Sequence, residues 1–145
     1  MMKYLTQEVN RNERPAVLRC TDLTYMNRLT KSDRGLMTQI MTVYLEQTPP
    51  LIKAMKQSLL DKDWRALYST VHKMIPSFSV VGIHTDFESM AKKLQEYARL
   101  NNETGQASEQ EQTERIPDLV LQLESVCMQA CQELQEEFNK LNNAA

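Results

Sequence analysis

The chain has 145 residues, of which 41% are apolar and 25% charged, so it fits one domain with a single core and is not disordered throughout. Its 17 basic and 19 acidic residues leave a formal net charge of -2, which argues against a nucleic-acid-binding protein. Only 3 glycines and 5 prolines are available for turns. Because a β-sandwich or barrel of this length needs many more turn residues, we predict an all-α protein.

The chain contains neither an apolar stretch long enough to cross a membrane nor, at its amino end (MMKYLTQE), the apolar segment of a secretory signal. We therefore expect a cytoplasmic protein. Its three cysteines, Cys20, Cys127 and Cys131, are an odd number without C-x-x-C spacing, which argues against a disulfide framework and a zinc site. Cys127 and Cys131 fall in an apolar stripe, so we interpret them as buried free thiols and expect no structural metal.

The amino-terminal residues are predicted to be separate from the domain. Residues 1–21 are polar and mixed, with a break at Pro15, and are interpreted as an arm or a short helix, whereas residues 22–145 form the helical domain. Apolar residues three apart over 23–29 predict a short helix at the start of that domain.

Two helices are predicted next along the chain. Ser32 is a suitable N-cap for a helix with a wide apolar face that reaches Leu45. Thr48 is followed by two prolines, a pattern that is typical of a helix N-cap with proline in the first turn. A separate helix is therefore expected from Thr48 to Leu60.

The central helix is expected over residues 64–81, because apolar side chains recur there every three or four positions and Asp63 can cap its start. Gly82 supplies its end. Thr85 and Glu88 then have the spacing of a capping box that opens the following helix.

The polar stretch over residues 101–115 is predicted to be a solvated connection or a frayed helical extension. A last helix is expected from near Pro117 to Leu141, with one apolar side along its whole length. These elements predict an antiparallel four-helix bundle with one or two additional short N-terminal helices.

His72 is the residue that departs from the pattern of a helical bundle. At about 100° per residue it lies roughly 130° from the centre of the apolar stripe of its helix, so its imidazole is expected to point to solvent. A solvated helix face normally carries charged residues, but the neighbours of His72 on this side are uncharged. An uncharged platform around an exposed histidine suggests a docking surface, made of Tyr68, Ser69, Ile75, Pro76 and Ser79.

The run from Val71 to Gly82 (VHKMIPSFSVVG) resembles the signature of histidine-containing phosphotransfer (HPt) domains, in which the histidine is followed ten residues later by a glycine. The upstream segments TPPLI (48–52) and DKDW (61–64) are similar to the family's helix leading into the histidine. The resemblance covers residues 22–141 and implies a helical bundle with an exposed phosphoaccepting histidine on a central helix.

The resemblance implies that His72 carries a phosphoryl group between the aspartates of receiver domains, so that the partners are a response-regulator receiver domain or a hybrid sensor histidine kinase, or both. It implies a phosphocarrier and not an autonomous enzyme, with no cofactor and no nucleic-acid or membrane partner. A neutral imidazole can attack phosphorus, and the partner can supply much of the charge compensation, including its metal ion. Two other interpretations remain: a degenerate HPt-like module that binds receivers without transfer, and a plain scaffold bundle.

The sequence departs from the family pattern at two positions, since Ile75 stands in place of a lysine and Pro76 in place of a glycine. The missing lysine removes a cation beside the phosphoryl group. If the next helix runs antiparallel, residues around 92–95 should lie opposite His72, which makes Lys92, Lys93 and Gln95 hypothetical replacements that stabilise or orient the phosphate.

Pro76 has no N–H with which to bond the carbonyl of His72, so a kink is expected there. The kink would either leave room for a receiver or only bend the helix around the core.

Overall fold

The computed structural model describes residues 19–104 and 110–143, with side chains except at 104 and 110–114. Its helices are α1 (Thr24–Thr30), α2 (Arg34–Leu60), α3 (Trp64–Val81), α4 (Thr85–Thr104) and α5 (Gln110–Asn143). Within these two ranges the regular secondary structure is entirely helical, which confirms the predicted class. Of the predicted amino-terminal arm, residues 1–18 lie outside the described residues.

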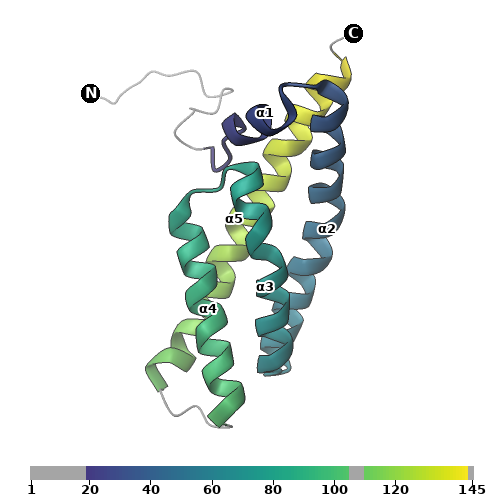
Figure 1. The fold of residues 1–145 in the computed structure, drawn as a ribbon. Helices are drawn as coiled ribbons and strands as arrows, with labels where there is room; N and C mark the ends of the chain where they lie inside the picture. The colour runs from purple at the N-terminus through teal and green to yellow at the C-terminus, as the bar shows by residue number, and fades with distance from the viewer. Residues whose placement is uncertain (1–18, 105–109, 144–145) are drawn as a thin grey trace, which may run out of the picture.

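The four long helices lie lengthwise beside one another (Figure 1). α3 packs against both α2 and α4, and α5 packs against the same two helices, while the short α1 packs against α2 and α3. No helix within the described ranges is both long enough and apolar enough to span a membrane.

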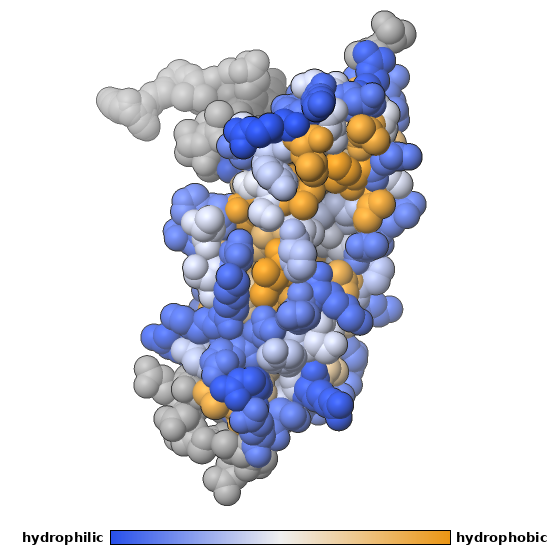
Figure 2. Space-filling view, viewed as in Figure 1, coloured by the Kyte–Doolittle hydropathy of each residue, from blue (hydrophilic) through white to orange (hydrophobic). Residues whose placement is uncertain are grey.

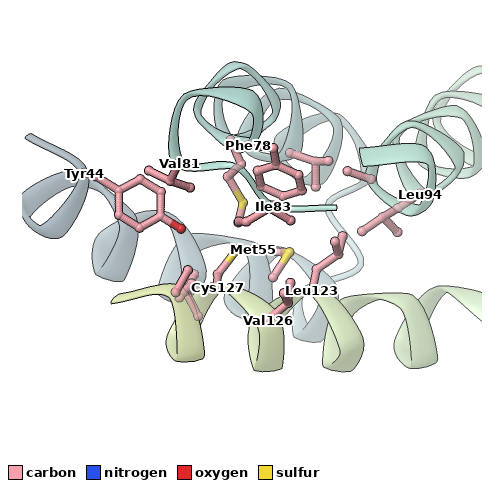
Figure 3. Close-up of a cluster of buried hydrophobic side chains, with 14 of the residues drawn as sticks. Tyr44, Met55, Phe78, Val81, Ile83, Leu94, Leu123, Val126 and Cys127 are labelled. Atoms are coloured by element: carbon pink, nitrogen blue, oxygen red, sulfur yellow. The ribbon is translucent and has the colours of Figure 1, made fainter. Parts of the chain in front are cut away.

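One continuous core fills the space between the helices (Figure 3). It receives side chains from every helix, and methionines contribute strongly to it, because their flexible side chains fill irregular gaps. Its largest fully buried members include Met26, Met41, Met55, Leu67, Phe78, Leu94, Ile116, Leu123 and Leu134.

The prediction of two helices between residues 32 and 60 is wrong, because α2 continues through Pro49 and Pro50. Thr48 is therefore not an N-cap; it lies inside α2 and is only 5% exposed. Both prolines lie on the exposed side of α2, where water can bond the carbonyls that they leave free. The buried stripe from Met37 to Met55 passes behind them without interruption, and its burial outweighs a local cost of about 3 kcal/mol per proline.

The predicted caps are correct for one of the three helices concerned. Asp63 caps α3 by accepting a hydrogen bond from the backbone N–H of Ala66, at 3.1 Å. α2 is capped by Asp33 and not by Ser32. α4 begins at Thr85 itself, and the residue before it, His84, accepts a hydrogen bond from the backbone N–H of Asp86 through ring Nδ1.

Where the structure describes it, the stretch over residues 101–115 is helical, which agrees with the predicted alternative of a helical extension. α4 continues to Thr104, and α5 begins at Gln110, so Pro117 lies inside α5 and not at its start. Residues 105–109 of this stretch are not among the described residues. Ile116 is fully buried, which gives this early part of α5 a core contact that the polar sequence around it concealed.

Gly82 ends α3 as predicted, with a left-handed backbone (φ 74°). A Cβ at this position would lie only 1.9 Å from the carbonyl oxygen of Asp22. The backbone N–H of Asp22 donates to the carbonyl of Val81, at 3.1 Å. Glycine is therefore required both by the turn and by the close passage of the chain that enters α1.

Residues 19–21 are held on α5 by the carboxylate of Glu133, which is 7% exposed. It accepts hydrogen bonds from the backbone N–H groups of Cys20 and Thr21 and from the Thr21 hydroxyl. Arg19 pairs with Glu137, one turn further along α5, at 3.4 Å. Burial by itself would raise the pKa of Glu133, but the hydrogen bonds, including one from Gln129, outweigh it and lower that pKa.

Candidate functional site

His72 lies in the middle of α3, with its side chain exposed. The opposite side of the same helix is anchored in the core by the buried residues Leu67, Val71, Met74 and Phe78. The imidazole therefore projects from a helix whose position is fixed by packing, in the orientation that the periodicity predicts. This placement suits a side chain that has to be reached by a large partner.

Gln95 of α4 holds the imidazole from one edge. Its side-chain nitrogen Nε2 lies 3.0 Å from Nδ1 of His72. The contact follows from the link between the two helices, because α3 and α4 are joined only by residues 82–84 and run in opposite directions (Figure 1). The contact engages Nδ1 and not the other ring nitrogen, Nε2.

The ring of Tyr68 lies parallel to the imidazole. The two rings are stacked with their centroids 6.1 Å apart and their planes within 5° of parallel. Tyr68 stands four residues before His72, and side chains at this spacing lie one above the other on a helix. Tyr68 and Gln95 together fix the plane and the rotation of the ring while leaving Nε2 uncovered by either contact.

The predicted platform surrounds His72 on α3. Ser69, Pro76 and Ser79 are exposed. Tyr68 and Ile75 are half-buried, and both pack against the core. This surface is uncharged and is backed by the core, so a partner could cover it without having to bury an unpaired charge from these five residues.

The lysines that were proposed to lie near His72 make other contacts. Lys92 pairs with Glu88 on its own helix, at 3.1 Å. Lys93 lines a hollow between α4 and α5 together with Asp118, on a different side of α4 from Gln95. Of the three residues expected opposite His72, Gln95 is thus the one whose side chain contacts the imidazole.

Arg99 is a cation of α4 that the sequence prediction did not consider. It lies one turn beyond Gln95 on α4 and forms ion pairs with Glu96 and Glu103. Its guanidinium donates hydrogen bonds to both carboxylates.

Pro76 lies inside α3, which continues through it from Trp64 to Val81. The carbonyl of His72 therefore lacks the helical hydrogen bond that residue 76 would otherwise donate. The kink expected there remains a prediction.

A second surface feature lies on the other side of α3. A hollow of about 490 Å³ between α2 and α3 is lined mainly by apolar side chains, including Ile40, Val43 and Val80, and by Lys73 at its edge. Figure 2 shows apolar side chains gathered on the surface beside α1 and the adjoining part of α2. Lys73 thus faces away from the α4 side of His72, in agreement with its expected position on the helix.

The cysteines have the chemistry of core residues. Burial raises the pKa of Cys127 to about 12, and burial together with the nearby Glu133 carboxylate raises the pKa of Cys20 to about 12. Burial also raises the pKa of Cys131. Such thiols remain protonated near neutral pH and are poor nucleophiles and poor metal ligands.

Comparisons with protein-family models, with curated proteins and with solved structures found no match.

Proposed function

We propose that this chain is a histidine-containing phosphotransfer protein, which carries a phosphoryl group on His72 between the aspartates of receiver domains. The observation that carries the proposal is the state of His72: an exposed imidazole on a core-anchored helix, held at Nδ1 by Gln95, with Nε2 left open. We interpret the four long helices as the antiparallel four-helix bundle of this family, acting in the cytoplasm.

The chemistry assigned to His72 is a reversible transfer. Its Nε2 lone pair attacks the phosphorus of an aspartyl phosphate, so that a P–N bond forms while the P–O bond to the aspartate breaks and the aspartate carboxylate is released. In the second step the carboxylate of another receiver attacks the same phosphorus, and the imidazole recovers its lone pair. The chain therefore ends unchanged and acts as a carrier rather than as an autonomous enzyme.

Gln95 supports this chemistry by controlling where the ring proton sits. Its amide can present either its nitrogen or its oxygen to Nδ1 by a half-turn of the amide group. When the oxygen faces the ring it accepts a hydrogen bond from Nδ1–H, and the lone pair is then on Nε2, where the attack takes place. Gln95 thus takes the orienting role among the three residues proposed for α4, while the roles of Lys92 and Lys93 beside the phosphate are open.

The uncharged platform around His72 is proposed as the surface on which a receiver domain docks, either free or as part of a hybrid sensor kinase. A receiver brings its own acidic site and metal ion to the transfer. The carrier therefore has to align His72 with the receiver's site and to offer a contact surface from which water is excluded, more than to supply charge.

The test is transfer of labelled phosphate from receiver domains charged with acetyl phosphate. The wild-type chain should acquire phosphate that is stable in alkali and labile in acid, as expected for a P–N bond. His72→Gln should acquire none. His84→Gln is the matched control, because His84 is also exposed and is the only other histidine in the chain. Phosphoramidate provides a second donor that needs no protein partner.

Two outcomes would replace the proposal. Receiver binding without phosphate on His72 would identify a degenerate docking module, and neither binding nor phosphate with either donor would identify a scaffold bundle.

A further inference from the structure

We propose that the hollow between α2 and α3 binds a small amphipathic carboxylate. The apolar side chains of the hollow take up a straight hydrocarbon chain, and the ammonium group of Lys73 pairs with the carboxylate. The inference is independent of the proposed function, because none of the five platform residues around His72 lines the hollow.

The hollow has the size and composition of a small-molecule site. Its volume of about 490 Å³ lies within the roughly 300–1,000 Å³ that is usual for such sites, which are mostly apolar with a few polar groups. Among its lining residues, Tyr44, Thr48 and Val81 are buried. Leu29 and Val43 also line it, but 54% and 49% of their surfaces are exposed. A hydrocarbon chain in the hollow would remove these two side chains from water.

The hollow is closed at one end by α1. α2 and α3 are joined only by residues 61–63 and pack side by side, so they run in opposite directions (Figure 1). α1 packs against both of these helices and contributes Leu29 to the lining. A helix of a partner protein needs a groove that is open at both ends. A hollow with one closed end favours a ligand of limited length.

The single charge of the hollow lies away from α1. Lys73 is in the middle of α3, whereas Val80 is near the end of that helix, beside α1. The seven residues between them correspond to roughly 10 Å along the helix axis. The extended chain of decanoate has about this length, so it can place its carboxylate at Lys73 and its methyl end at Val80.

Lys73 makes the hollow complementary to an anion. Among the described residues that line the hollow, it alone carries a charge. It forms no ion pair with a carboxylate of any described residue. A ligand carboxylate therefore gains a cationic partner without displacing one from the protein, whereas an alkylammonium ion of the same length is repelled.

The experiment measures binding of decanoate to the full, unphosphorylated chain by calorimetry and by NMR of the methyl groups. Wild type should bind one decanoate saturably, with shifts of the methyl resonances of Leu29, Val43 and Val80. Decanol should bind about two- to fivefold more weakly, as expected for the loss of one exposed charge pair, and decylammonium more weakly still.

Three variants locate the site. Lys73→Gln should weaken binding of decanoate by about two- to fivefold and leave binding of decanol unchanged. Val43→Gln should weaken binding of both. Lys53→Gln is the matched control, because Lys53 is an exposed lysine of α2 that does not line the hollow, and it should change neither.

Absence of saturable decanoate binding, or equal affinity of wild type and Lys73→Gln for decanoate, would overturn the inference. Methyl resonances of the hollow that shift with protein concentration and not with decanoate would assign it to a second copy of the chain, which also overturns the inference. Phosphate labelling of His72 is a separate measurement, so the failure of either proposal is distinguishable from that of the other.

Discussion

The amide nitrogen of Gln95 lies 3.0 Å from Nδ1 of His72, so a side chain of α4 holds the exposed imidazole of α3. Two residues 23 positions apart in the chain are brought together by one short turn. The contact engages Nδ1, so under the proposed function a phosphoryl donor would approach the other ring nitrogen, Nε2.

Replacing Gln95 should slow phosphorylation of His72. In Gln95→Leu the ring keeps its stacking on Tyr68 but loses its hydrogen bond at Nδ1, so neither the tautomer nor the rotation of the ring is held by α4. We expect the phosphorylation rate to fall by about 3- to 10-fold, the size of one hydrogen bond. The rate is measured with phosphoramidate, to exclude effects on docking. Gln135→Leu, an exposed position on α5, is the control and should keep the wild-type rate.

Replacing Pro76 with alanine should stabilise the protein. The new N–H can donate to the carbonyl of His72 and complete the hydrogen-bond pattern of α3, so we expect the free energy of unfolding to rise by about 1–3 kcal/mol. Denaturant unfolding measures this change. A stability equal to that of wild type would show that the structure around α3 already compensates for the proline.

The same variant separates the two interpretations of Pro76. If the proline makes room for a receiver, transfer from a charged receiver slows in Pro76→Ala while phosphorylation by phosphoramidate does not. If it only bends α3 around the core, both rates stay the same.

Gly82→Ala should destabilise the fold by about 2–4 kcal/mol. The added Cβ combines a left-handed backbone with a collision against the carbonyl of Asp22, and a backbone group cannot move aside cheaply. Thermal and denaturant unfolding report the loss. Gly35→Ala is the control, because its Cβ would meet only a side-chain oxygen of Asp33, at 3.3 Å, and it should change stability far less.

The Glu133 contacts predict a specific dependence of stability on pH. The hydrogen bonds to residues 20 and 21 lower its pKa below the ordinary 4.5, so the folded state prefers the carboxylate. Its contribution is complete above that ordinary value and is lost as the pH falls through the lower folded value. Wild type should therefore lose stability on acidification, and Glu133→Gln should lose less over the same range.

At neutral pH Glu133→Gln should be less stable than wild type by about 1–3 kcal/mol, the usual value for hydrogen bonds to a charged group. Glu136→Gln is the control, since Glu136 is exposed on the same helix. An unchanged pH profile in Glu133→Gln would show that other carboxylates govern acid unfolding.

The sequence predicted α3 almost completely, because three independent signals agree there: the cap at Asp63, the apolar stripe and the glycine at its end. It failed at Pro49 and Pro50, where a local rule for helix starts was overridden by the buried stripe of α2. Periodicity shows which side of a helix is apolar. It does not show whether burial of that side stabilises the helix enough to offset the cost of prolines within it.

The residues of the candidate site were likewise predicted only in part. Counting residues back from the turn after α3 placed Gln95 level with His72, and the contact is present. The count gives the level along α4 but not the side, so it also selected Lys93, which faces α5.

The attachment of residues 19–21 to Glu133 has a consequence for how the molecule is made. These contacts join positions more than 110 residues apart. A ribosome delivers the amino end first. Residues 19–21 therefore have no Glu133 carboxylate to bind until α5 has left the exit tunnel. Residues 19–21 are thus among the last parts of the described chain to be secured, whereas α1, which packs against α2 and α3, can dock before α5 is made.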